Sequence, residues 1–209
     1  MKLAVGIPLS WPYCHSDFFD SFTMLDKPEG TEVIRSQSGP IHEMRNTIVM
    51  RALAMDCTHL LFLDADMIYP QDTITRLFLR KRNIVGALTF KRWPPFNPIL
   101  YTGEPYKMRL MEQIPKGITE VTATGTGCLM INCEVFDNID YPWFKFDKTE
   151  ENNPVGEDID FCYRARAAGY SIHVDCDIET EHMTLMRVNK NLWSLSEKLM
   201  KTGQGEFNF

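Results

Sequence analysis

The pattern of apolar and polar positions along the chain predicts the order of its secondary-structure elements. Mostly apolar runs, typical of strands buried on both faces of a sheet, occur at residues 2–7, 58–66 and 83–90, and a further strand is expected at residues 171–177. Apolar residues three and four positions apart, typical of amphipathic helices, occur at residues 41–56, 72–81 and 156–170. Strands that alternate with helices predict one α/β domain with a mostly parallel sheet.

The segments between these elements carry weaker patterns. A loop rich in aromatic residues is expected after Pro8, and a short strand is expected at residues 32–37. Residues 99–121 are expected to form a hairpin-like region. Residues 124–139 begin with a glycine-marked turn, which we expect to lead into a strand and a short helix.

Length and composition fit a single domain and argue against some partners. The chain has 209 residues, of which 44% are hydrophobic and 24% charged, an ordinary globular balance. Its net charge of −6 gives no support for binding to nucleic acid or to an anionic membrane, because both usually require a basic face. We expect a main domain over residues 1–182 and a polar C-terminal lid or tail over residues 183–209.

Cysteine usage and the N-terminus indicate a cytoplasmic protein. None of the six cysteines forms a CxxC pair and most lie in apolar segments, so buried free thiols in a reducing compartment are expected. The first apolar run is broken at Pro8, which is too early for a signal peptide. No apolar run approaches the roughly 20 residues needed to span a bilayer, so we expect no transmembrane segment.

A pair of carboxylates ends the buried run at residues 58–66. Asp64 and Asp66 stand where an open α/β sheet usually binds its ligand, at the carboxyl end of a strand. Two carboxylates this close repel each other unless a cation lies beside them. A divalent metal fits, because hard cations prefer carboxylate oxygen. The alternative is that Asp66 or Asp72 only caps the helix that starts near Pro70.

Two further clusters carry groups that are able to do chemistry. Glu157 and Asp158 open the helix at residues 156–170, where carboxylates either interact with the helix dipole or accept a proton from a substrate hydroxyl. His182 follows the strand at residues 171–177. A lone histidine there is usually a surface residue, and it becomes a candidate ligand for Mn²⁺ or Mg²⁺ only if it meets Asp66 in space.

Arg45 and a pair of glycines complete the candidate residues. Arg45 lies on the helix at residues 41–56, and its side chain is either solvated or part of a site. Gly125 and Gly127, in TGTGCLMI, mark either a close approach of the backbone to a ligand or only a tight turn. The segment has neither the P-loop spacing and lysine nor the GxGxxG pattern of dinucleotide-binding proteins.

Taken in order, these segments resemble the GT-A glycosyltransferases, the family 2-like group in particular. The matching segments are the strand ending at Ile7-Pro8, Arg45-Asn46, LFLDAD at 61–66, TGTGCLMI at 124–131, GEDIDFCYRARAAGY at 156–170 and Glu181-His182. The resemblance covers about residues 2–184. It implies a GT-A fold, with a Rossmann-like, mostly parallel sheet flanked by helices. It also implies a glycosyltransferase (EC 2.4) that moves a sugar from a nucleotide-diphosphate sugar to an acceptor hydroxyl.

The resemblance implies a role for each matching residue. Asp66 and His182 would bind Mn²⁺ or Mg²⁺, and Asp64 would lie at the metal and near the ribose or the donor sugar. Asp158, beside Glu157, would be the catalytic base if the enzyme inverts. The residues implied to contact the nucleotide-sugar are Pro8, Arg45, Asp64, Asp66, Gly125 and Gly127.

Several alternatives stay open at this stage. The resemblance implies a UDP- or GDP-sugar as donor and a carbohydrate or another hydroxyl compound as acceptor, and it leaves the stereochemistry and the oligomeric state open. A sugar-phosphate nucleotidyltransferase is a second candidate, although residues 8–20 lack the glycine-rich basic loop of that class. A non-catalytic nucleotide-sugar-binding module is a third.

Two segments outside these motifs have hypotheses of their own. Trp93, in KRWPPFNP, either stacks on a sugar or closes the edge of the core. If the C-terminal segment is a lid, Arg187 and Lys190 would reach the diphosphate.

Overall fold

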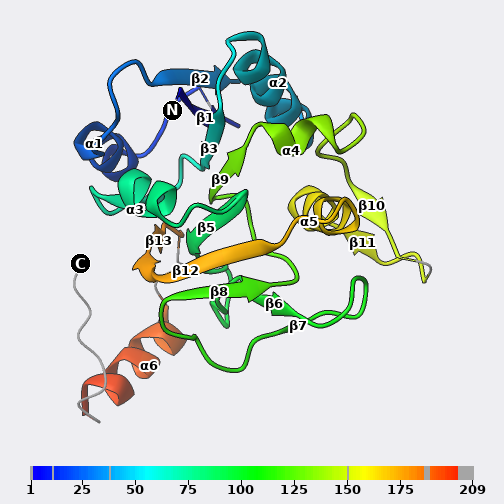
Figure 1. The fold of residues 1–209 in the computed structure, drawn as a ribbon. Coiled ribbons are helices and arrows are strands. Elements are labelled where there is room, and N and C mark those ends of the chain that lie inside the picture. Colours follow the sequence, from blue (N-terminus) through cyan, green and yellow to red (C-terminus); the bar gives the residue numbers. More distant parts are fainter. Residues whose placement is uncertain (1, 11, 38, 150, 186–188, 202–209) are drawn as a thin grey trace.

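The centre of the molecule is a seven-stranded sheet in the order β2-β1-β3-β9-β5-β12-β8 (Figure 1). The seven strands are β1 (Leu3–Pro8), β2 (Glu32–Ser36), β3 (His59–Leu63), β5 (Ile84–Leu88), β8 (Ile118–Val121), β9 (Cys128–Asn132) and β12 (Ile172–Glu179). This computed structural model describes residues 2–10, 12–37, 39–149, 151–185 and 189–201.

Most strands of the sheet point in one direction. β1 pairs in parallel with β2 and β3, and β12 pairs in parallel with β5. β9 is antiparallel to both β3 and β5, and β8 is antiparallel to β12. β2, β1, β3, β5 and β12 therefore run the same way, and the predicted mostly parallel α/β sheet is confirmed.

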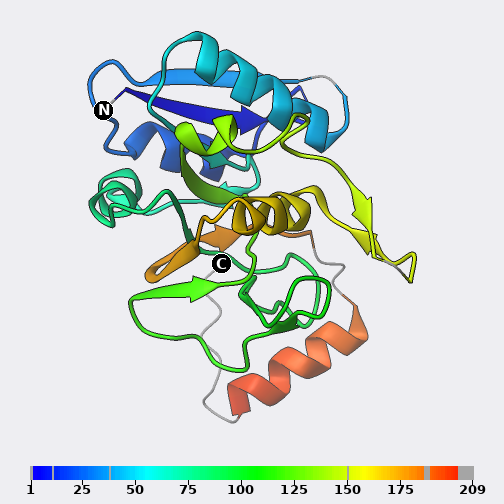
Figure 2. The ribbon, with the colours of Figure 1, turned by 45° about the vertical axis from the view of Figure 1, so that its right-hand side comes forward.

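Helices cover both faces of the sheet. The helices are α1 (Ser16–Met24), α2 (Ile41–Ala54), α3 (Thr73–Leu79), α4 (Glu134–Asp137), α5 (Glu157–Ala167) and α6 (Lys190–Lys201). α1 and α3 lie on one face and α2, α4 and α5 on the other, whereas α6 lies outside both layers (Figures 1 and 2). Short two-stranded pairs join β4 (Met67–Ile68) to β13 (Glu181–His182), β6 (Tyr101–Thr102) to β7 (Arg109–Leu110), and β10 (Asp147–Lys148) to β11 (Pro154–Val155).

The continuous apolar runs are explained by a core on each side of the sheet. Along β3, Leu60 and Phe62 pack toward α2 and α5, while Leu61 and Leu63 pack toward α1 and α3. Successive side chains of a strand point to opposite faces, so a strand covered on both faces needs apolar residues at every position. This burial fixes the strand up to Leu63 and leaves Asp64 as the first residue past the core.

Two helices, α1 and α6, were not predicted from the sequence. The aromatic segment after Pro8, expected to be a loop, contains α1. Phe18 is buried and its ring stacks on that of Phe22, with centroids 5.8 Å apart. The four-residue spacing of these two rings is the helical signal, because residues four apart lie on the same face of a helix.

The remaining expectations are partly met. All six cysteines are free, and all but Cys14 are buried, as expected. Among the described residues, no helix is long and apolar enough to cross a membrane. The C-terminal segment contains α6, and Arg187 lies outside the described residues.

Candidate functional site

The sheet topology brings the candidate residues to one edge. β3 and β5 end at this edge, and β9, which runs the opposite way between them, begins there. The register pairs Leu63 with Cys128, so Asp64 stands opposite Gly127, and the Asp64 N–H donates to the Gly127 carbonyl at 3.0 Å. Segments far apart in the sequence therefore meet because one antiparallel strand lies among parallel ones.

Arg45 joins two acidic residues at this edge. It is buried on α2, and its guanidinium lies 3.3 Å from Oδ1 of Asp64 and 3.3 Å from Oε1 of Glu157. The side chain is therefore part of the site and not solvated. A buried arginine that pairs with two carboxylates restricts the movement of both side chains. Arg45 therefore holds Asp64 in a fixed position relative to Glu157 of α5.

Asp66 forms a second cluster with two basic side chains. Its Oδ2 lies 2.9 Å from Nη2 of Arg92 and 3.4 Å from Nε2 of His182. The antiparallel pair β4–β13 places His182 there, since His182 is in register with Met67, directly after Asp66. Burial opposes ionisation of Asp66, but His182 and Arg92 outweigh it and lower the pKa of its carboxyl. The condition set for His182, that it meet Asp66 in space, is fulfilled.

The state of the His182 ring fits a metal ligand. Its Nδ1 lies 2.7 Å from the Phe90 carbonyl, which can only accept, so Nδ1 carries a proton. Nε2 is buried and makes no hydrogen bond with any described residue. Burial lowers the pKa of the His182 imidazole, but Asp66 and the Phe90 carbonyl raise it overall, so in one arrangement Nε2 is protonated and paired with Asp66. In the other arrangement the Nε2 lone pair faces the Asp66 carboxylate, and a cation has to join these two acceptors.

Only part of a coordination shell comes from the described residues. Among them, no group of three or more His, Cys, Asp and Glu side chains is arranged to hold a metal ion as it stands. Asp66 and His182 fit a divalent cation as a carboxylate oxygen and an imidazole nitrogen. Asp64, the third predicted ligand, is paired with Arg45.

Neither Asp66 nor Asp72 caps helix α3 with its side chain. α3 begins only at Thr73, and Asp66 precedes β4, so Asp66 lies outside the N-terminal turn. Asp72 occupies the N-cap position, yet its side chain makes no capping hydrogen bond. The capping interpretation is therefore wrong for Asp66.

Asp158 has the properties of a weak base at neutral pH. Burial and the neighbouring Glu157 raise the pKa of its carboxyl to about 6, against the opposing effect of Arg45. Its Oδ1 accepts a hydrogen bond from the Ile159 N–H at 2.8 Å. A carboxylate with a pKa close to neutrality suits proton transfer better than an ordinary aspartate, because it binds a proton more strongly and is still ionised.

The fold agrees with that of known proteins. No protein-family model matches the chain, and no curated protein matches it. Among solved structures, it is similar to A197 from STIV, with a TM-score of 0.61 and 17% identity over 88% of this chain and 86% of that one. It is also similar to TarS 1–349 from S. aureus, with a TM-score of 0.52 and 13% identity over 89% of this chain and 60% of that one. The fold is the GT-A fold. At these identities the likeness shows the fold alone.

Gly125 and Gly127 border the two acidic clusters of the GT-A sheet edge. A Cβ on Gly127 would stand 2.6 Å from Sδ of Met67 and 3.3 Å from Oδ2 of Asp64. A Cβ on Gly125 would meet Ile99 at 3.4 Å and Oδ2 of Asp158 at 3.7 Å, which are ordinary contacts. Position 127 therefore needs glycine because the side chains of Met67 and Asp64 lie close to its backbone.

These contacts predict different effects for two alanine substitutions. Gly127→Ala is expected to lower the free energy of unfolding by about 1–3 kcal/mol, because Met67 is buried and must move. Gly125→Ala is expected to change it by less than about 0.5 kcal/mol. Urea unfolding of the two variants measures the difference, and equal stabilities would contradict the packing described for Gly127.

Pro8 is the predicted residue with the weakest link to the others. It ends β1 at the same sheet edge and pairs with Ser36 of β2.

Trp93 lies in the loop after β5 and is 66% exposed, so it does not close the core edge.

The sequence interpretation missed two residues of this site. Arg92 contacts Asp66 from the loop after β5, although only Trp93 of that loop was singled out. The Tyr69 hydroxyl lies 2.8 Å from the carbonyls of both Asp64 and Gly127, and its single proton is shared between these two acceptors. The available signal was the position of Arg92, close behind a buried strand that ends at the same edge as β3.

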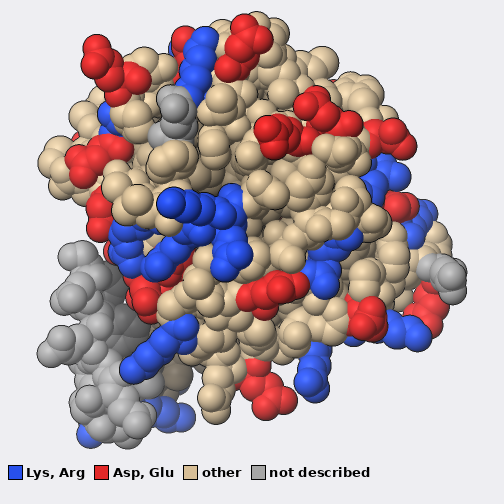
Figure 3. All heavy atoms as spheres, viewed as in Figure 1, with Lys and Arg blue, Asp and Glu red and all other residues tan. Residues whose placement is uncertain are grey.

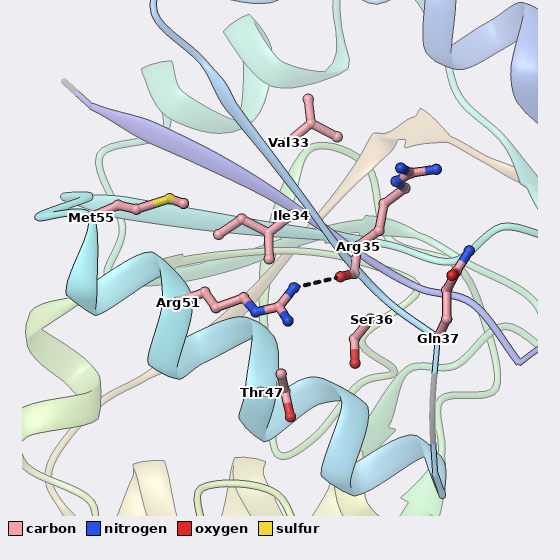
Figure 4. A pocket seen from close by; sticks show the side chains of 8 residues that line it. All are labelled: Val33, Ile34, Arg35, Ser36, Gln37, Thr47, Arg51 and Met55. Carbon is pink, nitrogen blue, oxygen red and sulfur yellow. Dashed lines mark hydrogen bonds between the residues drawn. The ribbon is translucent and has the colours of Figure 1, made fainter.

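Neither of two cavities in the described part of the chain contains the acidic clusters. One, of about 540 Å³, lies between β2 and α2 (Figure 4). There Nη1 of Arg51 donates to the Arg35 carbonyl at 3.0 Å. The other, of about 510 Å³, lies between the loop after β5 and the C-terminal segment. Arg92, which contacts Asp66, is among the described residues that line this second cavity.

Charges of both signs are interspersed on the face shown in Figure 3. Lysine and arginine are concentrated around α3, which carries Arg76 and is followed by Arg80, Lys81 and Arg82. Arg76 donates to the Asp177 carbonyl at 2.7 Å, and Arg80 lies 2.7 Å from Oδ2 of buried Asp175. These two arginines therefore tie α3 to β12.

Proposed function

We propose that the chain is a metal-dependent glycosyltransferase, similar to family 2, that moves a sugar from a UDP- or GDP-sugar to an acceptor hydroxyl. The observation that carries this proposal is the meeting of Asp66 with the buried Nε2 of His182, 3.4 Å from Oδ2, at the carboxyl edge of a GT-A sheet. Asp66 and His182 would hold Mn²⁺ or Mg²⁺, and when bound the cation would stabilise the negative charge of the departing nucleoside diphosphate.

The other residues would orient the donor and the acceptor. Arg45 holds Asp64 in a fixed position, where its free Oδ2 would accept hydrogen bonds from ribose or sugar hydroxyls. Asp158 would take the proton of the acceptor hydroxyl in an inverting reaction, while burial and the neighbouring Glu157 keep its pKa high. Gly125, next to Asp158, would leave space for the sugar.

The proposal is tested by thermal-shift measurements with UDP-, GDP-, CDP- and dTDP-sugars, each with and without Mn²⁺. A ligand that binds only the folded state raises the melting temperature. We expect a UDP- or GDP-sugar to raise it only when Mn²⁺ is present. The proposal fails if no nucleotide-sugar does so.

Product analysis separates this function from its alternatives. A glycosyltransferase releases a nucleoside diphosphate as the sugar appears in the acceptor. A sugar-phosphate nucleotidyltransferase would consume a nucleoside triphosphate and release pyrophosphate. A non-catalytic binding module would show the thermal shift and no turnover.

The raised pKa of Asp158 predicts the acidic limb of the pH profile. Below a pH of about 6 the carboxyl is protonated and cannot accept a proton, so kcat/KM is expected to fall about tenfold per pH unit. Initial rates at low donor concentration measure this limb. If the residual activity of Asp158→Asn shows the same limb, another group causes it.

A further inference from the structure

The loop after β5 is a short closed segment that presents Arg92. Phe90 forms a β-bridge with Pro98, and the Lys91 N–H donates to the Asn97 carbonyl at 2.9 Å. At the tip, the Phe96 N–H donates to the Trp93 carbonyl at 2.9 Å. The loop is thus anchored at the same residue, Phe90, whose carbonyl orients His182.

Arg92 contacts the carboxylate oxygen that the metal proposal requires. Its Nη2 lies 2.9 Å from Oδ2 of Asp66, and that same oxygen faces Nε2 of His182 at 3.4 Å. A guanidinium and a divalent cation are both positively charged. If both contact the same carboxylate oxygen, they lie close together and repel each other strongly. Arg92 and a cation bound by Asp66 and His182 therefore compete for Oδ2.

The surroundings of Arg92 allow it to move a short way. Its side chain is 46% exposed, in contrast to the buried Arg45. It also lines the cavity of about 510 Å³ between the loop and the C-terminal segment, together with Trp93 and Leu185. A guanidinium displaced from Asp66 would stay within this space, beside the proposed cation.

The chemistry of the side chain indicates what it would contact after moving. A guanidinium binds phosphate oxygens through two parallel hydrogen bonds, and such charge-assisted contacts are among the strongest in proteins. The proposed donor carries a diphosphate at the cation. Arg45 is already held by Asp64 and Glu157, which leaves Arg92 as the exposed arginine in contact with this cluster of described residues.

We propose that Arg92 is a donor-binding residue with two positions. Before the cation binds it holds Asp66, and afterwards it contacts the diphosphate of the nucleotide-sugar. This inference rests on the proposed function and assigns to Arg92 both a competition with the cation and a share of donor affinity.

The test is a pair of titrations on the full chain. Calorimetry measures the affinity for Mn²⁺ alone and then for pyrophosphate at saturating Mn²⁺, since pyrophosphate presents the diphosphate without a base or sugar. The proteins are the wild type, Arg92→Ala, Arg92→Lys and the control Arg166→Ala. Arg166 forms a comparable ion pair with Glu120, at 3.1 Å, away from Asp66. Circular dichroism of each variant checks that the fold is intact.

Opposite shifts are expected in the two titrations. Arg92→Ala should bind Mn²⁺ alone about two- to fivefold more tightly, because a partly exposed ion pair with Asp66 is removed. It should bind pyrophosphate at least about tenfold more weakly. Arg92→Lys should lie between it and the wild type, and Arg166→Ala should equal the wild type.

Other outcomes overturn the inference. Unchanged or weaker Mn²⁺ binding by Arg92→Ala would show that Arg92 does not compete for Asp66. Unchanged pyrophosphate binding would show that it does not contact the diphosphate. Wild-type protein that binds neither probe would remove the proposed metal site itself, and with it this role for Arg92.

Discussion

Asp66→Ala is expected to abolish metal-dependent donor binding. Asp66 supplies the oxygen that faces His182, so the substitution removes one of the two side chains proposed to bind the cation. Loss of an outer-shell partner alone lowers metal affinity about 10–100-fold, and loss of a direct ligand is expected to lower it by more than about 100-fold. Mn²⁺ titration and the Mn²⁺-dependent thermal shift with the nucleotide-sugar measure both effects.

Asp72→Ala is the matched control for this prediction. Asp72 is a nearby aspartate at the start of α3, and its partner is Arg76, at 3.7 Å on the surface. Its removal should leave Mn²⁺ and donor binding at wild-type values. If Asp66→Ala binds the donor with unchanged metal dependence, the metal assignment is wrong.

Asp158→Asn is expected to retain donor binding and to lose transfer. Asparagine has nearly the same shape and can still accept the hydrogen bond from the Ile159 N–H, so the start of α5 should stay intact. An amide cannot take the proton of an acceptor hydroxyl, and loss of a general base typically costs a factor of about 10²–10⁴ in rate. Single-turnover assays give the rate, and calorimetry with the donor gives the affinity.

The two measurements together separate catalysis from structure. A variant with weak donor binding would indicate that Asp158 positions the donor. Full turnover by Asp158→Asn would exclude it as the base and would favour a retaining mechanism, in which no base for the acceptor is needed at this position.

The elements that could be predicted are those whose pattern follows directly from burial. β3 and β5 are covered on both faces, so every position after His59 at the start of β3 is apolar or glycine and the strands are visible in the sequence. α1 was missed because the aromatic segment after Pro8, which includes Phe18, was interpreted as a loop, and the four-residue spacing from Phe18 to Phe22 was not used. The reversed direction of β9 was not predicted either, since hydrophobicity does not show the direction of a strand.

The residues of the candidate site also divide into those that could be predicted from the sequence and those that could not. Asp64, Asp66 and the acidic pair on α5 stand in recognisable segments, and the interest of His182 was correctly made conditional on a meeting with Asp66. That meeting depends on the pairing of β13 with β4, which joins residues more than a hundred positions apart. Arg92 was missed because its role depends on the path of the loop that starts at Phe90. Long-range contacts of this kind are not set by local propensity.

Anomalous diffraction from a crystal soaked with Mn²⁺ tests the central claim most directly, since the signal comes from the cation itself. The account predicts a peak at the carboxyl edge of β3, bounded by the Asp66 carboxylate and Nε2 of His182, with Arg92 turned away from Oδ2. A map with no peak there, and with Arg92 still paired to Asp66, would contradict it.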